Sequence, residues 1–268
     1  WAKARGCDPK DLACLRALPL ERLLPEEPGL EAMGRFLSNP SLFRTGPFKP
    51  HLSPFLLPQD PREALREGKA AGIPLIAGAN AEGVAFPSLQ ALLGPGDWEE
   101  AERRLLESGL SREKAQALLA HYRKGVPDPK RAWGEVQTDL TLLCPSLKAA
   151  RLQAPHAPTY AYLFTFRAPG WEGLGAFHGL ELAPLFGNLL ERPFLPLFLR
   201  QEAQEEAEYL GKKMRRYWTS FAKDGEPKGW PRWPLYREGH LLRLDVPLGL
   251  LPGLYGERCG GLEVVGLL

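Results

Sequence analysis

Two side chains have the chemistry and surroundings for proton transfer, His178 and Glu82. His178 lies in the segment 175–187, among small and apolar residues, between Gly175 and Gly179. Histidine titrates near neutral pH and is the commonest acid–base group in hydrolytic sites. A single histidine in a glycine-flanked loop is more often structural than catalytic. This segment therefore indicates a catalytic site only if a carboxylate partner for His178 can also be found.

Glu82 follows a short apolar run, residues 73–78, that is bounded by turn residues. Such a run predicts a buried strand of a parallel sheet. Because sites in open α/β sheets form beyond the carboxyl ends of the strands, the loop 78–83 is well placed for a functional carboxylate. A glutamate before a turn glycine is also common without any function, so local reasoning leaves both interpretations open.

A nucleophile with the expected surroundings is missing from the 268 residues. The Gly-x-Ser-x-Gly pattern of serine hydrolases does not occur. The nearest similarity, Ser108-Gly-Leu-Ser111, lacks the flanking glycines and a preceding strand. A glycine-rich loop that could supply amides to an oxyanion is also absent.

Other patterns predict helices alternating with short strands. Asp8 followed by Pro9 predicts a capped helix that runs to about Leu18. A helix that is acidic at its start and basic at its end should form a solvated outer helix at 201–223. Further helices are expected at 60–68, 97–108, 111–124 and 130–153. Strands are expected at 73–78, 159–167 and 240–245, and the third of these is expected to be the last strand of the chain.

Composition excludes several classes of function. The net charge is only +2 and basic residues are dispersed, which does not indicate a nucleic-acid partner. No apolar run reaches the roughly 18 residues of a membrane span. No cysteine–histidine cluster has zinc spacing, and the sequence implies no metal or other cofactor. Many prolines and few asparagines fit a heat-tolerant source, and a GC-rich genome would give the same bias.

Taken together, these segments resemble the type-B carboxylesterases, the α/β-hydrolase family that includes the cholinesterases, and in particular its bacterial, para-nitrobenzyl-esterase-like branch. The resemblance covers nearly the whole chain but only the later half of the family's length. The segments that carry it are 48–58, 75–78 with Glu82-Gly83, 175–187, the aromatic and proline series 218–236, and Glu257-Arg-Cys-Gly260. The aromatic residues that usually follow the last motif are missing.

The resemblance implies an α/β-hydrolase fold. Residues 1–268 would form the carboxyl-terminal part of a single carboxylesterase domain, namely the carboxyl-terminal portion of its central, mostly parallel sheet with flanking helices. The first residue is Trp1 rather than methionine, so the amino terminus is expected to be processed or cut. In the family, the half that bears the nucleophile lies upstream of this position.

The resemblance also implies a carboxylic ester hydrolase with a Ser-His-Glu triad and an acyl-enzyme intermediate. This chain would supply Glu82 and His178 but not the serine, and alone it should be inactive. The implied partners are a small-molecule carboxylic ester and the missing amino-terminal half. Phe48 and Phe86 match loosely the aromatic wall of the family's acyl pocket, and an ordinary core position is an equally good interpretation of each.

The four cysteines would be four buried thiols in the simplest interpretation. The resemblance instead implies two disulfides, Cys7–Cys14 and Cys144–Cys259. The second would close a loop of about 115 residues, for which chain entropy predicts roughly 4–5 kcal/mol of stabilisation. Paired cysteines would favour an exported protein, although disulfides also occur inside hyperthermophiles.

Two alternatives compete with a working esterase. One is a catalytically silent, cholinesterase-like binding protein that uses the fold as an interaction surface. Retention of both Glu82 and His178 argues against it, because binding alone requires neither. The other is a non-functional fragment, whose uncovered apolar strand edges should make it poorly soluble and able to bind hydrophobic dyes.

Overall fold

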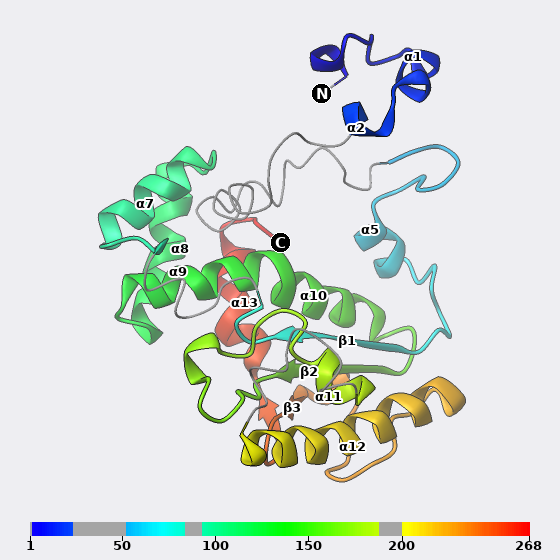
Figure 1. Cartoon of the computed structure of the whole chain (residues 1–268), viewed down its shortest axis with the longest axis vertical. Coiled ribbons are helices and arrows are strands. Elements are labelled where there is room, and N and C mark those ends of the chain that lie inside the picture. Colours follow the sequence, from blue (N-terminus) through cyan, green and yellow to red (C-terminus); the bar gives the residue numbers. More distant parts are fainter. Residues whose placement is uncertain (1, 24–51, 84–92, 188–199) are drawn as a thin grey trace. The chain divides into compact units, whose positions relative to one another are not determined.

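A computed structural model describes residues 2–23, 52–83, 93–187 and 200–268 of the chain (Figure 1). The chain divides into two compact units, Trp1–His51 and Leu52–Leu268. The described residues of the first unit form a 3-10 turn at Lys3–Arg5, helix α1 at Leu12–Ala17 and helix α2 at Leu20–Leu23. Every helix in the described ranges is too short or too polar to cross a lipid bilayer.

The expected start of the first helix is wrong. Helix α1 begins at Leu12, and its cap is Asp11, whose carboxylate accepts a hydrogen bond from the Cys14 amide at 3.0 Å. Asp8 instead accepts from the Lys10 amide at 2.8 Å and stabilises a turn. Both aspartates suit a helix cap or a turn, and only Asp11 directly precedes the residues that form the helix.

The second unit is built on a mixed sheet of four strands in the order β1-β2-β3-β4. Strands β1 (Leu75–Asn80), β2 (Thr159–Phe164) and β3 (His240–Leu244) are parallel, and β4 (Gly249–Pro252) is antiparallel to β3. The three expected strands are therefore confirmed. The expectation that the third is the last strand is wrong, because the chain turns over residues 245–248 and returns along β3 as β4.

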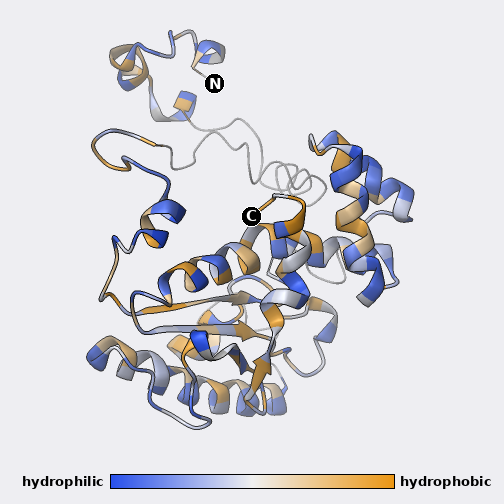
Figure 2. Cartoon of the chain, turned by 180° about the vertical axis from the view of Figure 1, so that it is seen from behind, coloured by the Kyte–Doolittle hydropathy of each residue, from blue (hydrophilic) through white to orange (hydrophobic). Residues whose placement is uncertain are grey.

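Helices cover both faces of this sheet. Alternate residues of β2 enter two different hydrophobic clusters: Ala161 and Leu163 join one, and Tyr160 and Phe164 join the other. This alternation places a core on each side of the strands, as buried parallel sheets require. Apolar residues accordingly run through the strands and the inward faces of the helices (Figure 2).

Most of the helices pack into the first cluster, and two of the three helices expected there have the expected boundaries to within about one residue. Helices α7 (Trp98–Glu107) and α8 (Arg112–Gly125) are separated where expected and are capped by Asp97 and Ser111. The expected helix 130–153 is interrupted: α9 (Pro129–Thr138) passes through a π-helical turn (Asp139–Leu143) into α10 (Cys144–Gln153), which packs on β1. Helix α13 (Leu254–Val264) packs on α10 and α8.

The second cluster contains the inner face of α12 (Gln201–Asp224), the long helix expected at 201–223. The outer-helix expectation holds for only one of its faces, since Ala207, Leu210, Met214 and Tyr217 are fully or almost fully buried. Periodic burial of this kind shows that α12 is amphipathic and supports the sheet.

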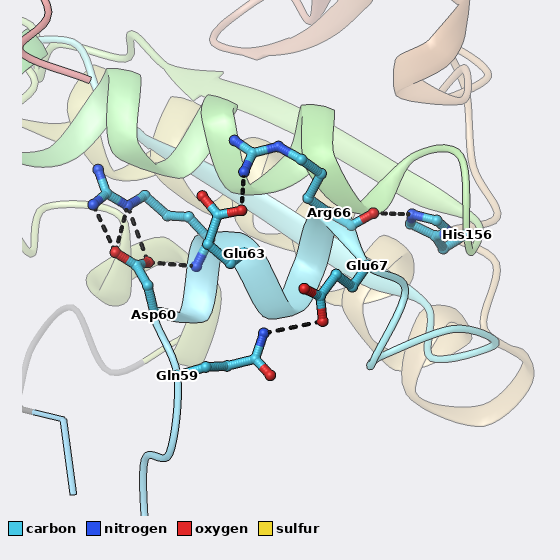
Figure 3. Close-up of polar contacts among 7 residues, drawn as sticks. Gln59, Asp60, Glu63, Arg66, Glu67 and His156 are labelled. Atoms are coloured by element: carbon cyan, nitrogen blue, oxygen red, sulfur yellow. Dashed lines mark hydrogen bonds and ion pairs between the residues drawn. The ribbon is translucent and has the colours of Figure 1, made fainter.

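A short helix before β1, α5 (Pro61–Arg66), is fixed by polar contacts (Figure 3). Asp60 caps it by accepting from the Arg62 amide at 2.8 Å, and Glu63 pairs with Arg66. Nε2 of His156, which follows α10, donates to the carbonyl oxygen of Arg66 at 3.1 Å. The helix that leads into β1 is thus tied to the end of α10.

Candidate active site

The chain brings Glu82 and His178 onto neighbouring segments at the carboxyl end of β1. Glu82 lies two residues beyond that strand, and its amide donates to the carbonyl oxygen of Ala176 at 3.2 Å. An isolated parallel bridge pairs Glu82 with Phe177, the residue directly before His178. The loop after the strand and the segment around His178 therefore run side by side.

A buried asparagine anchors the histidine segment. Asn80 is 4% exposed, and its Nδ2 donates to the carbonyl oxygen of Phe177 at 2.6 Å and to the carboxylate of Glu181. The Leu180 amide donates to the same carbonyl oxygen at 3.1 Å, and the Asn80 amide adds a bond that ties this turn to the end of β1. Sequence reasoning did not identify Asn80. The available signal was a polar residue at the end of an apolar strand, two positions before the proposed acid.

The conformation of the histidine segment depends on its glycines. Gly175 and Gly179 have φ angles of 63° and 89°, a region that side chains with a Cβ rarely adopt. They allow the backbone to turn on both sides of His178, so that Ala176, Phe177 and Leu180 enter the core while the imidazole is exposed. An exposed imidazole held by a buried backbone can meet a reacting group without rearrangement of the core.

Helix α11 (Leu182–Phe186) continues this segment and rests closely on α12. A Cβ added at Gly211 of α12 would lie 2.3 Å from the carbonyl oxygen of Pro184. Nη1 of Arg215, one turn later, donates to the same oxygen at 2.7 Å. The glycine thus permits the close approach, and the arginine satisfies a carbonyl of α11.

The carboxylate of Glu82 has partners other than His178. Its Oε2 accepts from the Ala176 amide at 2.8 Å, and its Oε1 accepts from Nη2 of Arg167. No hydrogen bond between the described residues joins this carboxylate to the His178 imidazole. Sequence reasoning did not identify Arg167, because nothing in the alternating pattern of 159–167 distinguishes it from a solvated arginine.

The structure describes some of the other expected site residues and leaves two of them outside its described ranges. Phe48 and Phe86 lie outside the described residues. The two disulfides join the pairs that the resemblance implied, Cys7–Cys14 and Cys144–Cys259. Within the described ranges, no group of three or more histidine, cysteine, aspartate or glutamate side chains is arranged to hold a metal ion.

A second polar cluster is buried near the longer disulfide. Asp139 is fully buried and accepts from Nε and Nη2 of Arg258, at 2.8 and 2.7 Å, and from the Tyr122 hydroxyl at 2.8 Å. Burial raises the pKa of Asp139 against the opposing effect of Arg258, and burial beside this carboxylate raises the pKa of Tyr122. With every carboxylate oxygen occupied, this cluster fixes α13 to α8 and to the π-helical turn.

Known proteins share this architecture. The model of the Carboxylesterase family matches residues 1–249. Para-nitrobenzyl esterase of Bacillus subtilis is 32% identical over 195 residues, which cover 71% of this chain and 37% of that protein. Human cocaine esterase is 27% identical over 213 residues, covering 71% of this chain and 36% of its own length.

Solved structures of carboxylesterases also match this chain. A thermophilic PNB esterase superposes with a TM-score of 0.71 at 26% identity, covering 97% of this chain and 52% of its own. A carboxylesterase of Geobacillus stearothermophilus gives a TM-score of 0.68 at 26% identity, with the same two coverages. The chain thus spans about half the length of these structures, and the expected α/β-hydrolase fold is confirmed. From the match over residues 1–249 and these likenesses, the chain belongs to the carboxylesterase family.

Proposed function

We propose that the complete protein hydrolyses carboxylic esters through a Ser-His-Glu triad in which this chain supplies Glu82 and His178. The observation that carries the proposal is the pairing of Glu82 with Phe177, which puts a carboxylate beside the histidine segment at the carboxyl end of a parallel strand. The serine and the oxyanion-binding amides come from outside the 268 residues, so this chain alone should be inactive. The names of the similar proteins support an ester substrate.

The chemistry assigns a separate role to each group. The serine oxygen attacks the ester carbonyl carbon while His178 accepts the serine proton. His178 then returns this proton to the leaving alcohol as the ester C–O bond breaks and the acyl-enzyme forms. Water attacks the acyl carbon while His178 accepts a proton from it, and His178 then gives this proton to the serine oxygen as the bond between that oxygen and the acyl carbon breaks and the carboxylic acid leaves. Glu82 orients the imidazole and stabilises the imidazolium.

The test is steady-state ester hydrolysis by the protein encoded by the complete reading frame. His178→Ala and Glu82→Gln should each lower kcat by at least about 10³-fold, since triad members act together. His121→Gln is the matched control, because His121 lies on α8 and bonds the Glu257 carbonyl oxygen. Variants of Glu82 and His178 that keep activity within tenfold of the parent would refute the proposal.

A silent binding protein is the second candidate, favoured by one observation: Glu82 is paired with Arg167 rather than with His178. A complete reading frame that carries the nucleophile motif with its serine replaced, together with no ester hydrolysis, would support this candidate. An intact motif together with hydrolysis that depends on His178 would exclude it.

A further inference from the structure

Arg167 is held at a fixed point beside the proposed acid. The amides of Thr165 and Phe166 both donate to the carbonyl oxygen of Leu244, at 3.0 and 3.2 Å, and extend the contact between β2 and β3. Phe166 and Ala168, on either side of Arg167, are 1% and 3% exposed. The backbone of Arg167 is therefore immobilised by the core, while its own side chain is 48% exposed and can move.

The two donors on the Glu82 carboxylate differ in kind. The Ala176 amide belongs to the histidine segment and lies two residues before His178, so it moves together with the imidazole. The Arg167 guanidinium belongs to a different segment and binds the other oxygen. Arg167 is therefore the donor that competes with His178 for this carboxylate.

A guanidinium at this place also opposes the proposed chemistry electrostatically. In a triad, the acid stabilises the imidazolium through its negative charge. An arginine bonded to the same carboxylate offsets that charge and repels an imidazolium nearby. Since the Arg167 side chain is half exposed, its ion pair with Glu82 is weak and reversible.

We propose that Arg167 is a latch on the acid: its guanidinium holds the Glu82 carboxylate away from His178, and the pair forms only when Arg167 leaves. The inference rests on the proposed function, because it gives a regulatory partner to the same two residues. Arg167 is a positioning residue in this account and touches no substrate.

The first experiment uses the 268-residue chain and no substrate. Nitrogen NMR shifts of the His178 ring report which tautomer is present, and a His178→Gln variant assigns the signals. In Arg167→Gln, the freed carboxylate should favour the Nδ1–H tautomer and change the tautomer ratio by about fivefold, which corresponds to about 1 kcal/mol. Arg167→Lys keeps the charge and should resemble the parent. Adding Glu82→Gln to Arg167→Gln should reverse the change.

A second measurement needs no substitution. Because high salt screens exposed ion pairs, the parent chain in about 1 M salt should shift toward the tautomer ratio of Arg167→Gln. An unchanged ratio in both Arg167→Gln and high salt would overturn the latch. A change that survives Glu82→Gln would also overturn it, since the carboxylate would then not be its cause.

The complete protein provides the functional readout. Arg167→Gln should raise kcat for ester hydrolysis by up to about fivefold with little change in KM, because more molecules hold the Glu82–His178 pair. A fall in kcat would show that Arg167 supports the acid and would overturn the latch. Failure of the proposed function would be a separate result, namely ester hydrolysis that survives His178→Ala. Whether or not the proposed function holds, the His178 tautomer ratio shows whether Arg167 holds the Glu82 carboxylate away from His178.

Discussion

The disulfide between Cys144 and Cys259 should be a major source of stability in the second unit. It joins α10 to α13 across a sequence separation of 115 residues, and both cysteines are fully buried. The ion pair between buried Asp139 and partly buried Arg258 lies at the same junction and ties the same helix in place. Loss of the disulfide frees the chain in the unfolded state, whereas most native contacts of α13 remain.

The expected magnitude follows from the loop lengths. Chain entropy gives about 5 kcal/mol for a loop of this size and about 2.5 kcal/mol for the loop closed by Cys7–Cys14, with its separation of 7 residues. The double substitution Cys144→Ala/Cys259→Ala should therefore destabilise the second unit by about 5 kcal/mol. Cys7→Ala/Cys14→Ala is the matched control, because its disulfide lies in the other unit.

Tryptophan fluorescence during urea unfolding is a suitable assay. Six of the seven tryptophans, all except Trp1, lie in residues 52–268, so the signal reports the second unit. The long-loop variant should show a large fall in its urea midpoint, and the control variant should show almost none. Equal shifts in the two variants, or a loss of less than about 1 kcal/mol for the long loop, would refute the chain-entropy reasoning.

Three further predictions concern the support of the site. Gly211→Ala should destabilise the protein by about 1–3 kcal/mol in thermal unfolding, because the added Cβ would overlap a carbonyl of α11. The control is Gly260→Ala in α13, which has open space around it and should stabilise the protein by about 0.5–1 kcal/mol. Asn80→Ala should cost about 1–3 kcal/mol and speed hydrogen exchange of the amides at 176–183, and unchanged exchange would contradict the anchoring role. The hydrogen bond from Arg62 lowers the pKa of Asp60 from 3.8 to about 2. The stabilisation from Asp60 is therefore complete above about pH 4 and is lost as the pH falls toward 2. A carboxyl carbon NMR titration should show a pKa of about 2 for Asp60, and Arg62→Gln should raise this pKa.

Much of the fold follows from local chemistry that a sequence displays. Asp60, Asp97 and Ser111 are the first residues of three ranges expected to be helical, and each caps the helix that follows it, because a short polar side chain before an amphipathic run has one favourable arrangement. Where two aspartates compete, as Asp8 and Asp11 do, sequence does not say which reaches a helical amide. Strand β4 was missed because its short segment Gly249-Leu-Leu-Pro252 does not alternate.

The candidate site was predicted only in part. Glu82 and His178 could be named because their segments carry motifs, and the closeness of the two segments follows from an isolated bridge between the loop after β1 and the histidine segment. Arg167 and Asn80 could not be assigned, since their contacts join segments 85 and 97 residues apart. A sequence shows which side chains can bond, and only the fold decides which of several donors reaches a given carboxylate.

The most direct test of the central claim is a pre-steady-state burst with a para-nitrophenyl ester and the complete protein. If Glu82 and His178 serve an acyl-enzyme mechanism, about one equivalent of alcohol should be released rapidly per molecule before the slower steady state. The burst should disappear in His178→Ala and be slowed by at least about 10³-fold in Glu82→Gln. A burst of unchanged rate and size in His178→Ala would contradict the account.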